Sequence, residues 1–153
     1  MLKINDLAPE FSLKDKNGKA WGLKDFRAKY LIIYFYPKDS TPGCTVEARG
    51  FNQNIHQFRK WNAEIAGISG GDEATKKKFC EQNYLDLTLL SDKDYSVSAK
   101  YHIYGEKTFL GKKFMGINRT TFILDSNRKI IAVFDKVHPE THAEEVLSFI
   151  KDL

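Results

Sequence analysis

Cys44 belongs to the stretch YPKDSTPGCT of residues 36–45, whose residue types predict a reactive position for its sulfur. An apolar, β-branched and aromatic run ends abruptly at Pro37, as a buried strand does when it leaves a sheet. Thr41 as an N-cap and Pro42 at the first helical position then predict the start of a helix. Cys44 falls in the first turn of that helix, where unpaired N–H groups and the helix dipole favour the thiolate, the reactive form. We therefore expect Cys44 to act as a nucleophile.

The helix that contains Cys44 is predicted to run to about Asn62 and to turn one side toward the core. Its apolar residues recur every three or four positions, the spacing of a single helix face: Cys44, Ala48, Phe51, Ile55 and Phe58. Cys44 begins this stripe, so we expect it to be partly buried. A half-buried cysteine on such a stripe is more often an inert core residue, so periodicity alone does not establish a reactive site.

The other elements alternate between short apolar runs and helical patterns. Asn17-Gly18 predicts a short N-terminal hairpin, and the glycine- and lysine-bearing segment from Ile103 to Ile117 is predicted to be irregular. Strands are expected at 31–36, 64–69, 87–90, 119–124 and 129–134, and further helices at 74–83, 95–101 and 139–153. This order implies an α/β protein with a mixed central sheet and helices on both faces, a thioredoxin-like sandwich.

The composition is that of a globular chain with no strong bias in charge. The 153 residues fit one domain and carry a net charge of +4 without a long basic tract. Nucleic-acid binding is therefore poorly supported, and the cluster Lys76-Lys77-Lys78 is expected to be solvated. The chain has no leader pattern and no segment apolar enough to span a bilayer, which predicts a cytoplasmic protein. In that reducing compartment, a pairing of the two cysteines is expected to be transient and catalytic.

Metal and cofactor chemistry finds little support in the residues. His138 and His142 are four apart, but the pattern is not HExxH and no third ligand is nearby in sequence, so surface histidines are favoured. The absence of a CxxC pair argues against a thioredoxin-type oxidoreductase, and no haem or flavin signature is present. We expect sulfur chemistry that needs neither a metal nor a cofactor.

Motifs along nearly the whole chain fall in one consistent order. FYPKDSTPGCT carries the pattern Pro-x-x-x-Thr-x-x-Cys through Pro37, Thr41 and Cys44. APEFSL near the start, LLSD at 89–92, YGEK at 104–107 and GINRTTFILD at 116–125 accompany it. In these motifs and their order the chain resembles the peroxiredoxins of the PrxQ, or bacterioferritin comigratory protein, type.

This resemblance implies a thiol peroxidase that reduces hydrogen peroxide or organic hydroperoxides. Cys44 would be the peroxidatic cysteine, which attacks a peroxide oxygen and becomes a sulfenic acid. Arg119 would stabilise the thiolate and hold the peroxide, and the Thr41 hydroxyl would cap the helix and bond a peroxide oxygen. Pro37 would shape the pocket and keep it dry rather than react. Glu47, one turn beyond Cys44, needs a partner beside a thiolate, and Arg119 is the expected one.

Cys80 is the second thiol and the candidate resolving cysteine. Many members of the subfamily resolve from a position five residues after the peroxidatic cysteine, where this chain has Arg49, and some resolve from the next helix. Lys76 and Lys77 lie one turn before Cys80 and are expected to favour its thiolate. The helix has few apolar anchors, so we expect it to open at low cost. The alternative is that Cys80 is incidental and an outside thiol resolves Cys44.

The leading interpretation is a thioredoxin-dependent peroxidase that forms an intramolecular Cys44–Cys80 disulfide. A hydroperoxide is then the substrate, and thioredoxin or a similar dithiol is the reductant. The resemblance favours a monomer, whereas the scattered charges and the lack of a long apolar segment argue against binding of nucleic acid or a membrane. A second interpretation is a peroxide sensor or holdase-type binding protein with little turnover. A third is a non-catalytic thioredoxin-fold module with two structural thiols.

Overall fold

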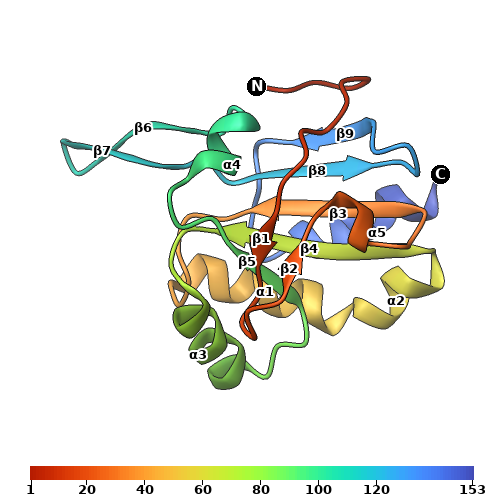
Figure 1. Ribbon diagram of the computed structural model, residues 1–153, viewed down its shortest axis with the longest axis horizontal. Helices are drawn as coiled ribbons and strands as arrows, with labels where there is room; N and C mark the ends of the chain where they lie inside the picture. The colour runs from red at the N-terminus through yellow and green to blue at the C-terminus, as the bar shows by residue number, and fades with distance from the viewer.

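A seven-stranded mixed sheet in the order β2-β1-β5-β4-β3-β8-β9 forms the centre of the computed structural model, which describes residues 1–153 (Figure 1). The strands are β1 (Leu13–Lys14), β2 (Ala20–Trp21), β3 (Tyr30–Phe35), β4 (Ala63–Ser69), β5 (Thr88–Ser91), β8 (Thr120–Leu124) and β9 (Ile130–Phe134). β3, β4 and β5 pair in parallel, whereas β8 is antiparallel to β3 and β9 is antiparallel to β8. β1 and β2 form the expected N-terminal hairpin.

Helices cover both faces of this sheet. The helical elements are η1 (Leu23–Asp25), α1 (Pro42–Gln53), α2 (Ile55–Lys60), α3 (Glu73–Asn83), α4 (Ser96–Lys100) and α5 (His142–Lys151). One core cluster takes buried side chains from α1, α2, α3 and α5, and the second takes them from η1, α4 and the N-terminal segment. The predicted thioredoxin-like sandwich is therefore confirmed.

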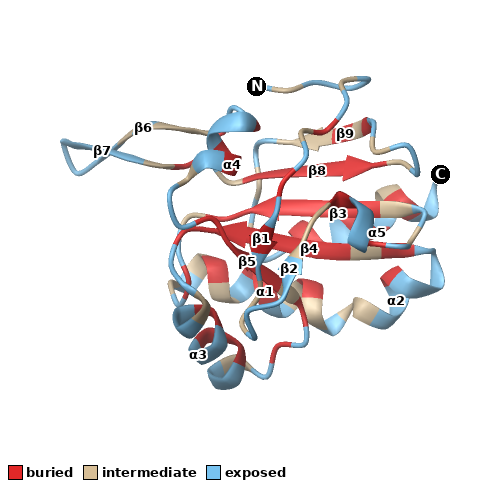
Figure 2. Ribbon diagram, in the orientation of Figure 1, coloured by how far each residue is buried: buried red, intermediate tan, exposed pale blue.

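β3 lies at the centre because it is apolar on both sides. Successive side chains of a strand point to opposite faces. Ile32 and Tyr34 accordingly belong to the cluster under α1, and Leu31, Ile33 and Phe35 belong to the other. All of them are buried, and β3 is accordingly red along most of its length in Figure 2. A strand covered on both faces has little freedom to shift, so the loop that follows it starts from a fixed point.

The long helix predicted from Pro42 to about Asn62 is two helices. α1 ends at Gln53, and Asn54 separates it from α2 with a backbone conformation that departs from the helix, at φ −107° and ψ 8°. The Asn54 side chain donates to the carbonyl of Gly50, and such local bonds from asparagine compete with the helical ladder. The apolar stripe continues across this break, which is why periodicity alone does not reveal it.

The expectation that residues 103–117 are irregular is wrong. They form a two-stranded antiparallel ribbon, β6 (Tyr104–Phe109) and β7 (Lys112–Ile117), which projects from the body of the molecule (Figure 1). Leu110 and Gly111 join the strands, and both have positive φ, as tight hairpin turns require. Leucine is rare in that conformation, so the sequence carries only half of the usual turn signal.

The remaining boundaries agree with the sequence prediction to within a few residues. The last helix starts at His142 rather than Pro139, and its predicted apolar face, Ala143, Val146, Leu147 and Ile150, is buried.

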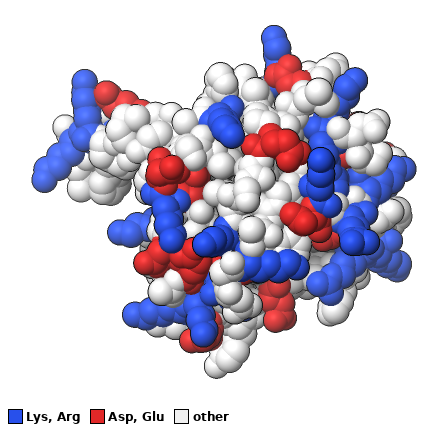
Figure 3. Space-filling view, in the orientation of Figure 1, with Lys and Arg blue, Asp and Glu red and all other residues white.

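No helix is both long and apolar enough to cross a membrane. On the face seen in Figure 3, basic and acidic side chains are interspersed, and the projecting β6–β7 ribbon carries both kinds.

Candidate active site

Cys44 lies in the first turn of α1, at the end of the loop that leaves β3. Thr41 precedes the helix in an extended conformation, Pro42 opens it, and its first hydrogen bond runs from the Thr45 N–H to the Thr41 carbonyl. The N–H groups of Gly43 and Cys44 therefore precede the helical ladder. The predicted placement of Cys44 at a helix N-terminus is confirmed, and its burial exceeds the expectation because the residue is 1% exposed.

Arg119 reaches this sulfur from a distant part of the chain. It comes directly before β8, whose first residue, Thr120, pairs with Phe35 at the end of β3. This register puts Arg119 beside the loop that leads to Cys44. Its Nη2 donates to the Cys44 Sγ at 3.5 Å, and its side chain is 20% exposed. The guanidinium therefore lies between the buried sulfur and the solvent. Its positive charge favours a negative charge on that sulfur.

Glu47 is the second partner of this guanidinium. Nη1 of Arg119 donates to Glu47 Oε1 at 2.7 Å, as the sequence predicted, and the carboxylate is fully buried. Burial raises the pKa of the Glu47 carboxyl to about 7, although Arg119 acts in the opposite direction. The other oxygen, Oε2, has no hydrogen-bond partner. The two nitrogens of Arg119 are therefore shared between a sulfur and a carboxyl group whose burial favours its protonated form.

Thr41 and Pro37 border the same loop. Thr41 is the N-cap residue, but its hydroxyl donates to the carbonyl of Lys38 at 2.9 Å and makes no cap bond to the helix. The predicted side-chain cap is therefore wrong, because the bond back to Lys38 closes the loop instead. Pro37 is half-buried directly after β3. Both residues lie where the sequence predicted, on the segment that carries Cys44.

Cys80 lies in α3 and is 2% exposed, with a free thiol like that of Cys44. Burial raises the pKa of the Cys80 thiol, and the positive charges of Lys16 and Lys76 only partly offset this. The expectation that nearby lysines favour a Cys80 thiolate is therefore wrong as a net effect. Lys77 is exposed and points away from the core.

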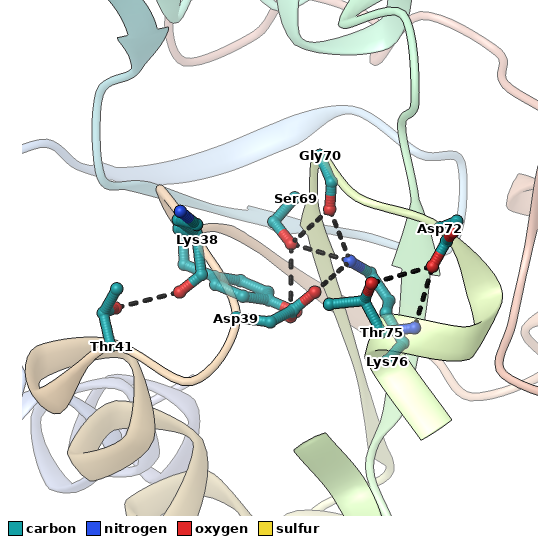
Figure 4. Close-up of polar contacts among 9 residues, drawn as sticks. Lys38, Asp39, Thr41, Ser69, Gly70, Asp72, Thr75 and Lys76 are labelled. Atoms are coloured by element: carbon teal, nitrogen blue, oxygen red, sulfur yellow. Dashed lines mark hydrogen bonds and ion pairs between the residues drawn. The ribbon is translucent and has the colours of Figure 1, made fainter. Parts of the chain in front are cut away.

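Sequence reasoning missed a buried polar network beside Cys80. Lys76, expected to be solvated, is fully buried, and its ammonium contacts Asp39 Oδ2 at 2.9 Å, Ser69 Oγ at 2.8 Å and the Gly70 carbonyl at 2.7 Å (Figure 4). Tyr36 donates its hydroxyl to the other oxygen of Asp39. The signal was present, because Lys76 precedes Phe79 and Cys80 by three and four residues and so shares their helix face.

His142 is also buried, in contrast to the surface position predicted for it. One ring nitrogen lies 2.7 Å from Thr121 Oγ1 and the other 2.9 Å from Glu145 Oε1. Burial lowers the pKa of the His142 ring. His138 is exposed, and no group of three potential ligand side chains is gathered as a metal ion would require.

The site occupies the carboxyl ends of β3 and β4, the edge where ligands of α/β sheets usually bind. The cavities lie elsewhere or beside it. One of about 410 Å³ includes Ala28, Phe58 and Ala63, toward the amino ends of the strands. Another of about 410 Å³ borders the exposed side of Arg119 and includes Asn118 and Lys136.

A buried cysteine at a helix N-terminus, paired with an arginine on a thioredoxin-like fold, defines a cysteine-dependent oxidoreductase. The pattern of the AhpC/TSA family matches residues 4–133. Peroxiredoxin Bcp of Escherichia coli K12 is 40% identical over 151 residues, which cover 99% of this chain and 97% of that protein. Peroxiredoxin Bcp of Bacillus subtilis is 36% identical over 152 residues, with coverage of 99% and 97%.

Solved structures give the same result. The Xylella fastidiosa PrxQ structure, a cysteine-to-serine mutant, superposes with a TM-score of 0.92 at 30% identity and covers 99% of this chain and 97% of that one. The bacterioferritin comigratory protein of Xanthomonas campestris has a TM-score of 0.86 at 33% identity, with coverage of 93% and 90%. The chain therefore belongs to the AhpC/TSA family and is a peroxiredoxin of the Bcp, or PrxQ, type. As a class, these proteins are thiol peroxidases.

Proposed function

We propose that Cys44 is the peroxidatic cysteine of a peroxidase that reduces hydrogen peroxide and organic hydroperoxides. Its thiolate attacks one oxygen of the peroxide, so that an S–O bond forms and the O–O bond breaks. Two electrons pass from sulfur to oxygen, the product is water or an alcohol, and Cys44 is left as a sulfenic acid. The observation that carries this proposal is the 3.5 Å contact between Arg119 Nη2 and the Cys44 sulfur at a helix N-terminus.

Arg119 stabilises both the reactant and the transition state in this proposal. Negative charge develops on the departing oxygen as the O–O bond breaks, and a fixed donor near that oxygen lowers the barrier. Thr41 supplies a hydroxyl on the loop that leads to Cys44, and Pro37 shapes the pocket where that loop begins. Glu47 orients the guanidinium through its 2.7 Å contact and is a positioning residue, because its carboxylate meets Arg119 rather than the sulfur.

Cys80 resolves the sulfenic acid in the second step. Its sulfur attacks the Cys44 sulfur, the S–S bond forms, the S–O bond breaks, and water leaves. The two cysteines line the same core cluster, which favours an intramolecular pairing. Two solved variants of the Xanthomonas campestris protein each replace one cysteine by serine, and the two positions have the same spacing as Cys44 and Cys80. Thioredoxin, or a similar dithiol, then reduces the disulfide.

The proposed substrate class and cellular compartment rest on a relative and on the redox cycle. The Xanthomonas campestris relative is described as having alkyl peroxide reduction activity, and this chain shares its fold and family. We assign hydrogen peroxide and alkyl hydroperoxides to the same site here. A cycle that returns both thiols to the reduced state suits a monomer in a reducing cytoplasm supplied with thioredoxin.

Steady-state peroxide consumption with thioredoxin and its reductase tests the proposal. We expect continuous turnover by the wild-type protein, background consumption by Cys44→Ser, and loss of thioredoxin-dependent turnover in Cys80→Ser. Peptide mapping of peroxide-treated protein should then find a Cys44–Cys80 disulfide. A single stoichiometric burst with reductant present would instead favour the peroxide sensor. Oxidised Cys44 beside a free Cys80 would refute the resolving role.

A further inference from the structure

The buried ion pair between Asp39 and Lys76 joins the two segments that carry the cysteines. Asp39 lies in the loop between β3 and α1, five residues before Cys44. Lys76 lies in α3, one turn before Cys80. Their contact therefore crosses from one sulfur-bearing segment to the other, as Figure 4 shows.

Both charges of this pair are fully engaged. Lys76 has three acceptors for its three ammonium hydrogens, and two of them, Ser69 and Gly70, belong to the end of β4 and its exit. Asp39 is 6% exposed and also accepts from the Tyr36 hydroxyl. Separating such a pair without water leaves a charge buried and unpaired, which is strongly unfavourable. The pair thus opposes any movement of α3 away from the Cys44 loop.

Movement of this kind is required by the chemistry. The two thiols are free, and they are 1% and 2% exposed. A disulfide constrains its two Cα atoms to a narrow range of separations, and its reduction requires a sulfur that a partner thiolate can reach. Closure must bring two sulfurs that are free here into bonding contact, and re-reduction must expose a bridge whose cysteines are buried, so we expect both steps to move the segments that carry them. α3 is the segment expected to move, because Phe79 and Cys80 are its only buried apolar residues.

We propose that the Asp39–Lys76 pair is a latch that sets the rate of the resolving step, with both residues acting as positioning residues. The inference rests on the proposed function of Cys80. A closed latch prolongs the lifetime of the Cys44 sulfenic acid. During that time a second peroxide molecule can add an oxygen to the sulfur and leave as water or alcohol, which gives the sulfinic acid. The latch therefore also sets how much peroxide the protein withstands before Cys44 is over-oxidised.

Lys76→Met tests the latch, because it removes the ammonium and keeps a long side chain. Lys77→Met is the matched control, since Lys77 is exposed on the same helix. We expect Lys76→Met to raise the rate of Cys44–Cys80 disulfide formation about tenfold or more, because a buried charge no longer has to be separated. Formation of the Cys44 sulfenic acid should stay within about twofold, because Arg119 and the start of α1 are unchanged. Sulfinic acid at high peroxide should fall.

Alkylation of Cys80 in the reduced protein separates this inference from the proposed function. Lys76→Met should raise the alkylation rate whether or not Cys80 resolves Cys44. Faster alkylation without any disulfide in the wild-type protein would support the latch and refute the resolving role. Normal disulfide formation with alkylation equal to that of Lys77→Met would overturn the latch and leave the proposed function intact.

Hydrogen exchange in the wild-type protein keeps the inference testable if Lys76→Met does not fold. Residues joined by a latch should open together, so the amides of α3 and that of Thr45, which donates to the Thr41 carbonyl of the loop, should exchange with one common opening free energy. Asp39→Asn, which retains a side chain able to accept from Tyr36, provides a second variant for the same readouts. Independent exchange of the two segments, with α3 opening freely while the loop stays closed, would overturn the proposal.

Discussion

The surroundings of Cys44 and Cys80 differ far more than their exposure. Both side chains are almost fully buried, at 1% and 2%, and both contribute to the same core cluster. Cys44 lies in the first turn of its helix and accepts a hydrogen bond from Arg119. Cys80 lies in the second half of α3, where burial raises its pKa. Burial alone does not distinguish the two sulfurs, so we expect the charges and dipoles around each one to decide its reactivity.

Loss of either sulfur should have the largest effect, and in different steps. Cys44→Ser removes the proposed nucleophile, so peroxide consumption should fall to background, by about a thousandfold or more. Cys80→Ser leaves the Cys44 site intact, so one equivalent of peroxide should still be consumed at the wild-type rate. Stopped-flow single-turnover measurements separate these results. Equal defects of the two variants in the first turnover would show that the two sites do not differ as described.

Removal of the Arg119 guanidinium should lower the reactivity of Cys44 toward that of Cys80. Arg119→Met deletes the donor at 3.5 Å from the sulfur, and we expect the rate of sulfenic acid formation to fall about 10²- to 10³-fold. Arg119→Lys should retain part of the rate, because a point charge remains but the two-pronged geometry is lost. Arg59→Met, an exposed substitution in α2, is the matched control. A rate unchanged in Arg119→Met would remove the electrostatic explanation.

The buried Glu47 carboxyl, next to Arg119 in the Cys44 site, should make the free energy of unfolding depend on pH. Its pKa is raised to about 7 in the folded protein from 4.5, so its contribution to stability is complete below pH 4.5 and is lost as pH rises through 7. Relative to Glu47→Gln, the wild-type free energy of unfolding should fall by about 3 kcal/mol across that window. Urea unfolding between pH 4 and 8 measures this. Exposed Glu81→Gln is the control, and a difference that rises with pH would contradict the assignment.

Thr41→Val should have the smallest of these effects. The substitution keeps the size of the side chain and removes the hydroxyl that now donates to Lys38. Loss of the proposed hydrogen bond to the peroxide should slow sulfenic acid formation about tenfold, whereas the loss of a half-exposed loop bond should alter stability by less than about 1 kcal/mol. Comparison of single-turnover rates and unfolding midpoints tests both parts. A large loss of stability with an unchanged rate would make Thr41 purely structural.

Local sequence signals predicted the parts of the fold that depend on local physics. The apolar run of β3, the N-cap and proline before Cys44 and the buried face of the last helix each involve neighbours in the chain. The β6–β7 ribbon escaped because Leu110 occupies a turn position that usually needs glycine or asparagine. The break at Asn54 escaped because the apolar stripe passes through it.

The candidate site was predictable to the extent that it is local. Cys44 follows from its helix start, whereas its contact with Arg119 depends on the register of β8 against β3 and came from the family resemblance. The burial of Lys76 depends on Asp39, 37 residues away, and composition suggested the opposite. The periodicity of apolar residues does not show which charged residues pair when they are far apart in the sequence.

Hydrogen peroxide reduction by the two single-cysteine proteins tests the central claim most directly. Cys80→Ser retains only Cys44, and Cys44→Ser retains only Cys80, with nearly equal burial of the remaining sulfur. We expect the protein with Cys44 to form a trappable sulfenic acid at least about a thousandfold faster, because the helix N-terminus and Arg119 act on that sulfur alone. Equal rates for the two proteins would contradict it.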